Sequence, residues 1–167
     1  WDPNIEAKMF QNWETANIYK FKNDSGKKQF VIDTPPPYPS GSPWHIGAAA
    51  HYSQIDMIAR TARMMGYDVL FPIGIDRNGL PVEIYTEKKY NISMISTPRE
   101  KFIDLCKTAL DDLESQMISI MKTMGLSGNF DNYYRTDSDE YRQLTQDSFI
   151  DLWNKDLIYQ SKRPKDY

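Results

Sequence analysis

The sequence has one cysteine, no long apolar run and no large excess of either charge. Cys106 alone cannot form an internal disulfide or a cysteine-based zinc site, and in a predicted helix it is expected to be a buried, inert thiol. No apolar run reaches the roughly 18 residues of a membrane span, and the first residues lack a signal-peptide pattern. We therefore expect a cytoplasmic location.

Basic character is also weak. The net charge is −3 over 167 residues, and the clearest basic segment is the short run 162–165 near the end of the chain. Nucleic-acid-binding domains usually carry a basic face, so we expect a nucleic-acid partner to be contacted mainly by regions outside this chain. Aromatic residues make up 13% of the sequence, which favours large apolar surfaces that a partner or further sequence covers.

Several familiar catalytic motifs are missing. The sequence contains no G-x-x-x-x-G-K-[ST], no G-x-G-x-x-G and no G-x-S-x-G, which excludes a P-loop, a dinucleotide fingerprint and a nucleophile elbow. The two histidines, His45 and His51, are six residues apart and do not share a helical face. We therefore assign no residue as a metal ligand.

Hydrophobic periodicity in the first 90 residues predicts a parallel βαβ unit. Asp2 and Pro3 have the pattern of an N-cap followed by proline at the first helical position, and Gly66 is a suitable helix end. The helix before Gly66 is expected to bury Ile55, Ile58, Ala59 and Ala62. The expected elements are a helix from Pro3 to about Ala16, a turn over 25–28, a buried strand over 29–33, a helix over 45–65, a strand over 68–72 and a helix over 80–90.

The remainder of the chain reads as long helices. Thr97-Pro98-Arg99-Glu100 has the pattern of a capping box, and Asp137-x-x-Glu140 resembles a second one; a short strand is expected over 157–159. The apolar stripe of the first helix, with its methionines as core filler, comprises Phe102, Leu105, Ala109, Leu113, Met117, Ile120, Met121 and Met124. Two or three parallel strands do not complete a sheet, so the predicted fold class is α/β, half of a Rossmann-like doubly wound parallel sheet with additional long helices.

Two loops that follow predicted strands are the candidate site, because ligands bind at the carboxyl ends of strands in open α/β sheets. The first contains Pro35-Pro36-Pro37-Tyr38-Pro39 and ends at Trp44-His45-Ile46-Gly47, where a helix N-terminus offers a phosphate site. A rigid proline loop with a helix-capping histidine is the alternative. The second, 74–79, places Asp76 between two glycines, where a carboxylate suits a ligand ammonium group; an Asx turn or a cap is the alternative. The first loop suits the phosphates and base of ATP, and the second suits the amino group of an amino acid, so this pair of ligands fits both loops.

These residues resemble a known family. Pro36-Pro37-Tyr38 followed by His45-Ile46-Gly47-Ala48 is similar to the first signature, HIGH, of class I aminoacyl-tRNA synthetases. Gly74-Ile75-Asp76-Arg77-Asn78-Gly79-Leu80-Pro81-Val82-Glu83 resembles the companion loop of the valine, isoleucine and leucine enzymes. The resemblance extends over residues 1–167 and is greatest to archaeal-type valyl enzymes.

The resemblance implies specific roles. His45, with a catalytic role, Ile46, Gly47 and Ala48 would contact ATP, accompanied by Mg²⁺. Pro36, Pro37 and Tyr38 would line the amino-acid pocket, and Asp76 would bind the α-ammonium group. The implied reaction forms valyl-adenylate from valine and ATP and then transfers the valyl group to tRNA(Val), with catalysis by positioning and by stabilisation of phosphate charge.

The sequence departs from the family pattern at two points. Ala48 occupies the fourth signature position in place of histidine, as in the archaeal-type valyl enzymes. The second signature, KMSKS, the editing insertion and the anticodon-binding region are absent. The expected organisation is therefore the N-terminal part of a catalytic domain, with an N-terminal helix and turn (1–28), a βαβ core carrying both loops (29–90) and a helical segment leading towards the insertion (91–167). We expect little or no activity from it alone. An isoleucyl enzyme, a small nucleotidyltransferase and a non-catalytic nucleotide-binding relative remain as alternatives.

Overall fold

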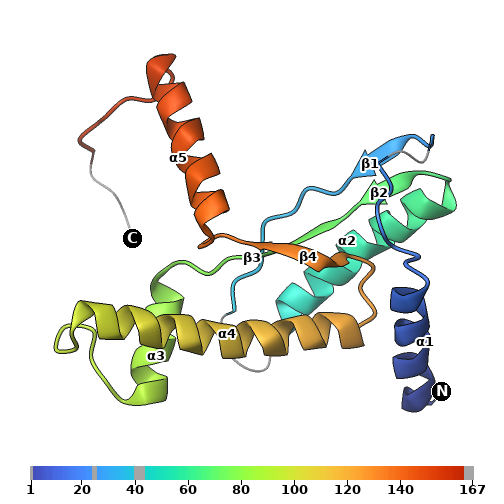
Figure 1. Cartoon of the computed structure of the whole chain (residues 1–167), viewed down its shortest axis with the longest axis horizontal. Coiled ribbons are helices and arrows are strands. Elements are labelled where there is room, and N and C mark those ends of the chain that lie inside the picture. The colour runs from blue at the N-terminus through green and yellow to red at the C-terminus, as the bar shows by residue number, and fades with distance from the viewer. Residues whose placement is uncertain (1, 24–25, 40–43, 164–167) are drawn as a thin grey trace.

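The computed structural model describes residues 2–23, 26–39 and 44–163. Part of the predicted turn, the middle of the first loop and the end of the basic run lie outside these residues. Figure 1 shows the order of elements, which is α1 (Pro3–Thr15), β1 (Gln29–Val31), α2 (Ile46–Met64), β2 (Asp68–Leu70), β3 (Pro72–Ile75), α3 (Leu80–Tyr90), α4 (Arg99–Thr123), β4 (Asn129–Arg135) and α5 (Asp139–Asn154). No helix in the described ranges is long and apolar enough to cross a membrane.

The predicted βαβ unit is confirmed. β1 pairs in parallel with β2, with Phe30 opposite Val69, and α2 connects the two strands. The pairing is shorter than the expected 29–33, although the Ile32 N–H still donates to the Leu70 carbonyl at 2.9 Å. The prediction of a buried strand is wrong for Val31, which is 59% exposed. Among the described residues, β1 pairs only with β2 and so lies at the edge of a two-stranded sheet.

One strand is missing from the sequence-based prediction. β4 pairs in parallel with β3, joining Pro72 to Asn129 and Ile75 to Arg135 with an irregularity between Pro72 and Gly74. The segment after residue 90 is therefore not helical throughout. Asparagine and aspartate are depleted in strands, so the NFDNYYR sequence does not have a strand pattern; its backbone becomes a strand by pairing with the buried β3.

The core lies between the strands, α2 and the second half of α4. Ile73, Ile75 and Met121 are at most 1% exposed. Met117 and Met121 pack in this cluster, which confirms them as core filler. The complete set of buried residues in the cluster is Ile32, Trp44, Tyr52, Ala59, Ala62, Val69, Phe71, Ile73, Ile75, Met117, Met121 and Leu126.

The buried stripe predicted for α2 is only partly correct. Ala59 and Ala62 are buried, but Ile58 is 53% exposed. In α4, Met124 is also exposed, whereas Leu110 and Glu114, which were not predicted to be buried, face the interior.

The helix caps differ from the predictions in two places. Asp2 caps α1 by accepting from the Asn4 N–H, as predicted. α4 begins one residue later than a Thr97 capping box requires: Pro98 is its N-cap, and no side chain caps it. α5 is capped by Ser138, which accepts from the Tyr141 N–H, and not by Asp137.

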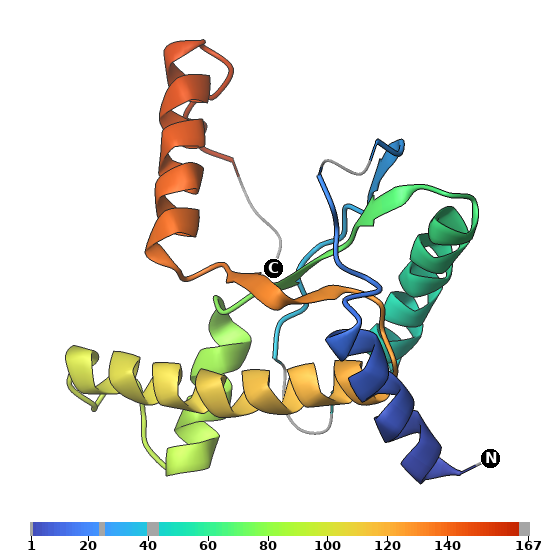
Figure 2. The same cartoon turned by 45° about the vertical axis from the view of Figure 1, so that its right-hand side comes forward.

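The end of the described chain also differs from expectation. Residues 157–159 form no strand, and α5 buries none of its side chains. Figures 1 and 2 both show α5 projecting away from the sheet, beyond the end of β4. Its apolar residues, which include Phe149 and Trp153, are half exposed.

Candidate nucleotide and amino-acid site

The two candidate loops lie side by side. The Asp76 N–H donates to the Pro37 carbonyl at 2.9 Å, so the end of β3 is hydrogen-bonded to the proline loop that follows β1. β1 belongs to one two-stranded parallel sheet and β3 to another, and each loop leaves the carboxyl end of its strand. This backbone hydrogen bond holds Pro37, a residue of the candidate pocket wall, next to Asp76, the candidate partner of the ammonium group.

His45 forms the N-cap of α2. Its Nδ1 accepts from the Gly47 N–H at 3.1 Å, so the helix-capping alternative describes its local geometry. An accepting Nδ1 carries no proton, which places the proton of the neutral ring on Nε2. A Cβ on Gly47 would lie 2.9 Å from the His45 ring, so glycine allows the ring to fold back over the helix end. His45 thus caps the helix and retains one N–H donor in an exposed position.

The other residues of the first signature differ in exposure. Ile46 is 80% exposed, whereas Ala48 is partly buried against the core. In the proline loop, Pro36 and Pro37 are partly buried and Tyr38 is half exposed. Ile46 therefore offers its backbone, more than a packed side chain, to a ligand at this edge.

Tyr52 ties the proline loop to α2. Its hydroxyl donates to the Pro35 carbonyl at 2.5 Å, and its ring contacts Trp44, with centroids 5.6 Å apart. Burial raises the pKa of Tyr52 to about 12, so the hydroxyl remains a donor at neutral pH. The ring of His51, the second histidine, contacts the edge of Tyr52 and is exposed.

The Asp76 carboxylate is held on one oxygen. Oδ1 accepts from the Asn78 N–H at 3.1 Å and from the Thr136 hydroxyl at 2.9 Å. The first contact is the Asx turn that was the alternative interpretation of this loop. The second contact comes from the residue after β4 and was not predicted. Within the described residues, no hydrogen bond reaches Oδ2 of Asp76.

Arg77 anchors the same loop in the interior. Its guanidinium is 4% exposed and contacts Glu114 at 2.5 Å, Asp111 at 2.8 Å and Asp137 at 3.1 Å. Burial alone would lower the pKa of Arg77, but the three carboxylates outweigh it and raise the pKa. The loop is therefore fixed to α4 and to the start of α5 by a permanently charged side chain.

Glu114 is the most buried carboxylate of this network. Burial would raise its pKa, but hydrogen bonds from Tyr133, Arg135 and Arg77 together lower the pKa below its usual range. The distances from these three side chains to the carboxylate oxygens are 2.5–2.9 Å. One signal in the sequence was usable: Glu114 follows Leu113 of the apolar stripe of α4, and a charged residue on that face implies a buried partner.

Gly74 is required for space and not for backbone conformation. A Cβ at this position would lie 2.1 Å from the Tyr134 ring. That ring stacks on Tyr141 of α5, with centroids 5.6 Å apart and planes 2° apart. Gly74 thus lets the side chains of β4 cross the end of β3 next to Asp76.

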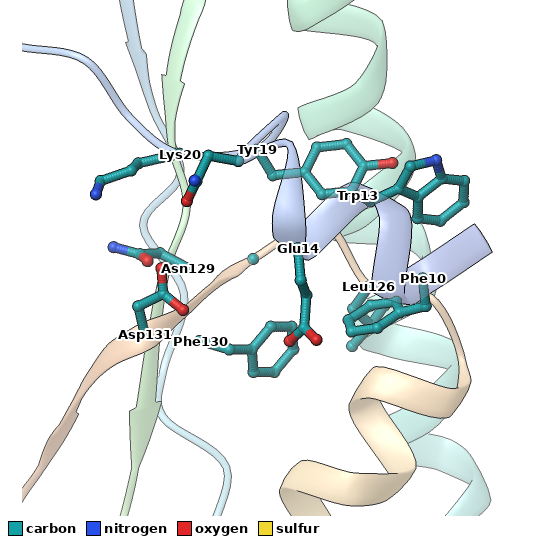
Figure 3. Close-up of a pocket in the computed structure, with 11 residues that line it drawn as sticks. Phe10, Trp13, Glu14, Tyr19, Lys20, Leu126, Asn129, Phe130 and Asp131 are labelled. Carbon is teal, nitrogen blue, oxygen red and sulfur yellow. The ribbon is translucent and has the colours of Figure 1, made fainter. Parts of the chain in front are cut away.

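Two cavities flank opposite ends of β4. One, of about 260 Å³, lies beside the second loop and is lined by Asn78, Thr136, Tyr141, Arg142, Thr145 and Gln146. The other, of about 40 Å³, lies between α1 and the start of β4, and the Glu14 side chain points towards Phe130 there (Figure 3). Only the first adjoins the candidate site. In the part of the chain that the structure describes, no three His, Cys, Asp or Glu side chains gather as metal ligands.

The βαβ unit, the two parallel strand pairs and the loops at the carboxyl ends of β1 and β3 define the class, half of a Rossmann-like α/β fold. Comparison with known proteins gives the family. The model of the family "tRNA synthetases class I (I, L, M and V)" matches residues 8–167, and the chain belongs to this family. That finding confirms the sequence-based resemblance and the predicted fold class.

Individual relatives are similar over nearly the whole chain. The valine–tRNA ligase of Pyrobaculum aerophilum is 48% identical over 165 residues, which are 98% of this chain and 20% of that protein. The valine–tRNA ligase of Aeropyrum pernix is 46% identical over 173 residues, with the same shares. A leucyl enzyme from Agrobacterium radiobacter K84, crystallised with tRNA and LeuAMS, superposes with a TM-score of 0.75 at 30% identity, covering 92% of this chain and 18% of that one. The chain therefore spans about a fifth of the length of these relatives.

Proposed function

We propose that this chain contributes the ATP- and amino-acid-binding part of a valine–tRNA ligase. The observation that carries the proposal is the hydrogen bond from Asp76 to Pro37, which joins the candidate ammonium partner to the wall of the candidate amino-acid pocket. The valine–tRNA ligases that resemble this chain at 46–48% identity support the choice of valine. The proposed substrates are valine, ATP and tRNA(Val), and the proposed location is the cytoplasm.

The roles in this proposal come from the family resemblance, and the geometry of the loops supports them. The Nε2–H of His45 and the backbone at Ile46 and Ala48 contact the ATP phosphates at the positive end of α2. Gly47, whose N–H is donated to His45, has no side chain and lets ATP approach the backbone. The valine carboxylate attacks the α-phosphate, and pyrophosphate leaves as the bond between the α- and β-phosphates breaks. The His45 donor follows the negative charge that develops on the α-phosphate in this step. Mg²⁺ arrives bound to the ATP phosphates.

The amino-acid side of the site is formed by the second loop. Oδ2 of Asp76 binds the α-ammonium group of valine, and Pro36, Pro37 and Tyr38 form an apolar wall for its side chain. Valine and isoleucine differ by one methylene, which is worth only about 1–3 kcal/mol in such a pocket. Rejection of isoleucine therefore depends on the size of the complete pocket and not on Asp76.

ATP–pyrophosphate exchange tests this function in the natural polypeptide that carries this chain. Exchange should require an amino acid and should be fastest with valine, slower with isoleucine and leucine. Asp76→Asn should raise the KM for valine strongly and leave the KM for ATP unchanged. Equal increases in both values would remove Asp76 from amino-acid recognition, and exchange driven best by leucine or isoleucine would replace valine as the substrate.

A further inference from the structure

The structure assigns Thr136 as a positioning residue for the carboxylate that receives the substrate ammonium group. This inference rests on the proposed function of Asp76. Thr136 directly follows β4, and its N–H donates to the Ile75 carbonyl at 3.1 Å, continuing the ladder of the parallel pair. The backbone of Thr136 is therefore fixed next to the second loop by the sheet itself.

The hydrogen bonds of the Thr136 hydroxyl fix the direction of its proton. Oγ1 lies 2.9 Å from the Arg77 nitrogen and 2.8 Å from the Asn78 Nδ2. Both of these groups can only donate, so they occupy the two acceptor lone pairs of the hydroxyl. Its single proton remains for Asp76 Oδ1, at 2.9 Å. The hydroxyl is saturated, and no alternative arrangement of its proton satisfies all three contacts.

This arrangement orients the Asp76 carboxylate. Oδ1 takes the hydrogen bonds from Thr136 and from the Asn78 N–H, so the rotation of the carboxylate is restrained from two directions. Oδ2 receives no hydrogen bond within the described residues and is the oxygen left for an ammonium group. Bonds to a charged acceptor are the stronger class of hydrogen bond, so the loss of Thr136 Oγ1 loosens the substrate-binding carboxylate.

Arg77 makes the support rigid. Its N–H donates to Thr136, and its buried guanidinium is held by Glu114 of α4. The Asp76 carboxylate is thus held by the Thr136 hydroxyl, which is held by the Arg77 backbone N–H. The Arg77 side chain is in turn held by Glu114 in the interior. Thr136 also lines the cavity beside this loop, so the support lies at the wall of open space and not deep in the packing.

Two substitutions isolate the hydroxyl. Thr136→Val keeps the shape and removes the donor, whereas Thr136→Ser keeps the donor and removes a methyl group. Pyrophosphate exchange by the natural polypeptide should show a KM for valine about tenfold higher for Thr136→Val, with the KM for ATP unchanged. Thr136→Ser should remain within about twofold of the wild type. Thr136→Ala removes the hydroxyl together with the methyl group, places no new apolar atom beside Asp76, and gives a second measurement should the valine variant not fold.

A pair of inhibitors separates positioning from general damage. Valyl-sulfamoyl adenosine and the same compound without its α-amino group differ only in the ammonium group. The ratio of their Kd values measures what that group contributes. We expect Thr136→Val and Thr136→Ala to reduce this ratio about tenfold, since the oriented carboxylate is lost. A purely structural role would weaken both inhibitors equally and leave the ratio unchanged, and that result overturns the assignment.

The Asp76→Asn variant keeps this test distinct from that of the proposed function. Suppose that the wild type binds the amino compound more tightly and that Asp76→Asn removes this preference. An unchanged ratio of Kd values in both Thr136→Val and Thr136→Ala then contradicts the role of Thr136 and leaves that of Asp76 intact. Where the wild type shows no preference for the amino compound, the ammonium role of Asp76 and the positioning role of Thr136 fail together.

Discussion

Replacing Glu114 with glutamine should destabilise the protein by about 3 kcal/mol. Glu114 and Arg77 are 2% and 4% exposed, and removing one partner of a buried ion pair costs about 3–5 kcal/mol because the other charge remains buried. Asp111 and Asp137 still neutralise part of the Arg77 charge, which places the expected loss at the low end. Each carboxylate oxygen of Glu114 accepts a hydrogen bond from an arginine. The Gln amide replaces one of these oxygens with an N–H₂ group, which cannot accept that hydrogen bond.

The measurement is urea-induced unfolding at pH 7, with Asp112→Asn as the matched control. Asp112 lies on the same helix and pairs with Lys89, but its side chain is 58% exposed, and exposed pairs contribute about 1 kcal/mol or less. In thermal unfolding, Glu114→Gln should lower the midpoint by about 6–12 °C, at about 2–4 °C for each kcal/mol. A loss for Glu114→Gln no larger than for Asp112→Asn would refute a stabilising buried network.

The pH dependence gives an independent check of the same network. The folded pKa of Glu114 is lowered, so its ionised form stabilises the folded state. This contribution is fully present above about pH 4.3, the pKa of an unfolded glutamate, and is lost as the pH falls through the lower folded value. The stability difference between the wild type and Glu114→Gln should therefore narrow below about pH 4. A difference that stays constant down to pH 3 would mean that the Glu114 charge does not stabilise the fold.

Three further substitutions or reactions test other parts of the structure. Gly74→Ala should cost about 1–3 kcal/mol in urea unfolding because its Cβ overlaps the Tyr134 ring; in a cycle with Tyr134→Ala the two losses should be less than additive, and full additivity would mean that the ring is not the obstacle. His45→Ala should lose about 1 kcal/mol of cap stability and His45→Asn much less, while both slow pyrophosphate exchange; normal exchange with His45→Asn would limit His45 to capping. Burial raises the pKa of the Cys106 thiol, so this lone cysteine should react with a disulfide reagent at pH 7 more slowly than glutathione does, and an equal rate would show it to be an ordinary exposed thiol.

The sequence predicts best those features whose physical cause is local. α3 begins and ends at Leu80 and Tyr90 as predicted, since Gly79 lies before its first residue and Asn91, with a φ of 51°, ends it in the left-handed conformation. α1 follows from its Asp2 cap and Pro3. The βαβ order also follows from local patterns, because each apolar run and the amphipathic helix between them is readable by itself.

Features set by distant residues are not readable in this way. β4 carries the polar sequence NFDNYYR and becomes a strand because β3 offers a buried edge about 60 residues earlier in the chain. The same is true of the site: Asp76 and its contact with Asn78 are local, but Thr136 lies 60 residues away. The charged Glu114 next to Leu113 of the apolar stripe was the local sign that a buried charge pair existed, and it did not identify Arg77 as the partner.

The two sides of the site are therefore stabilised in different ways. The nucleotide side depends on a contact two residues long, from Gly47 to His45 at the start of α2, and it forms wherever that helix forms. The amino-acid side depends on Asp76 being held by Thr136 and on Arg77 reaching Glu114, contacts that exist only after α4 and β4 have packed. Loss of the Thr136 or Glu114 contacts should accordingly weaken amino-acid binding before ATP binding, because the Gly47–His45 hydrogen bond makes no direct use of α4 or β4.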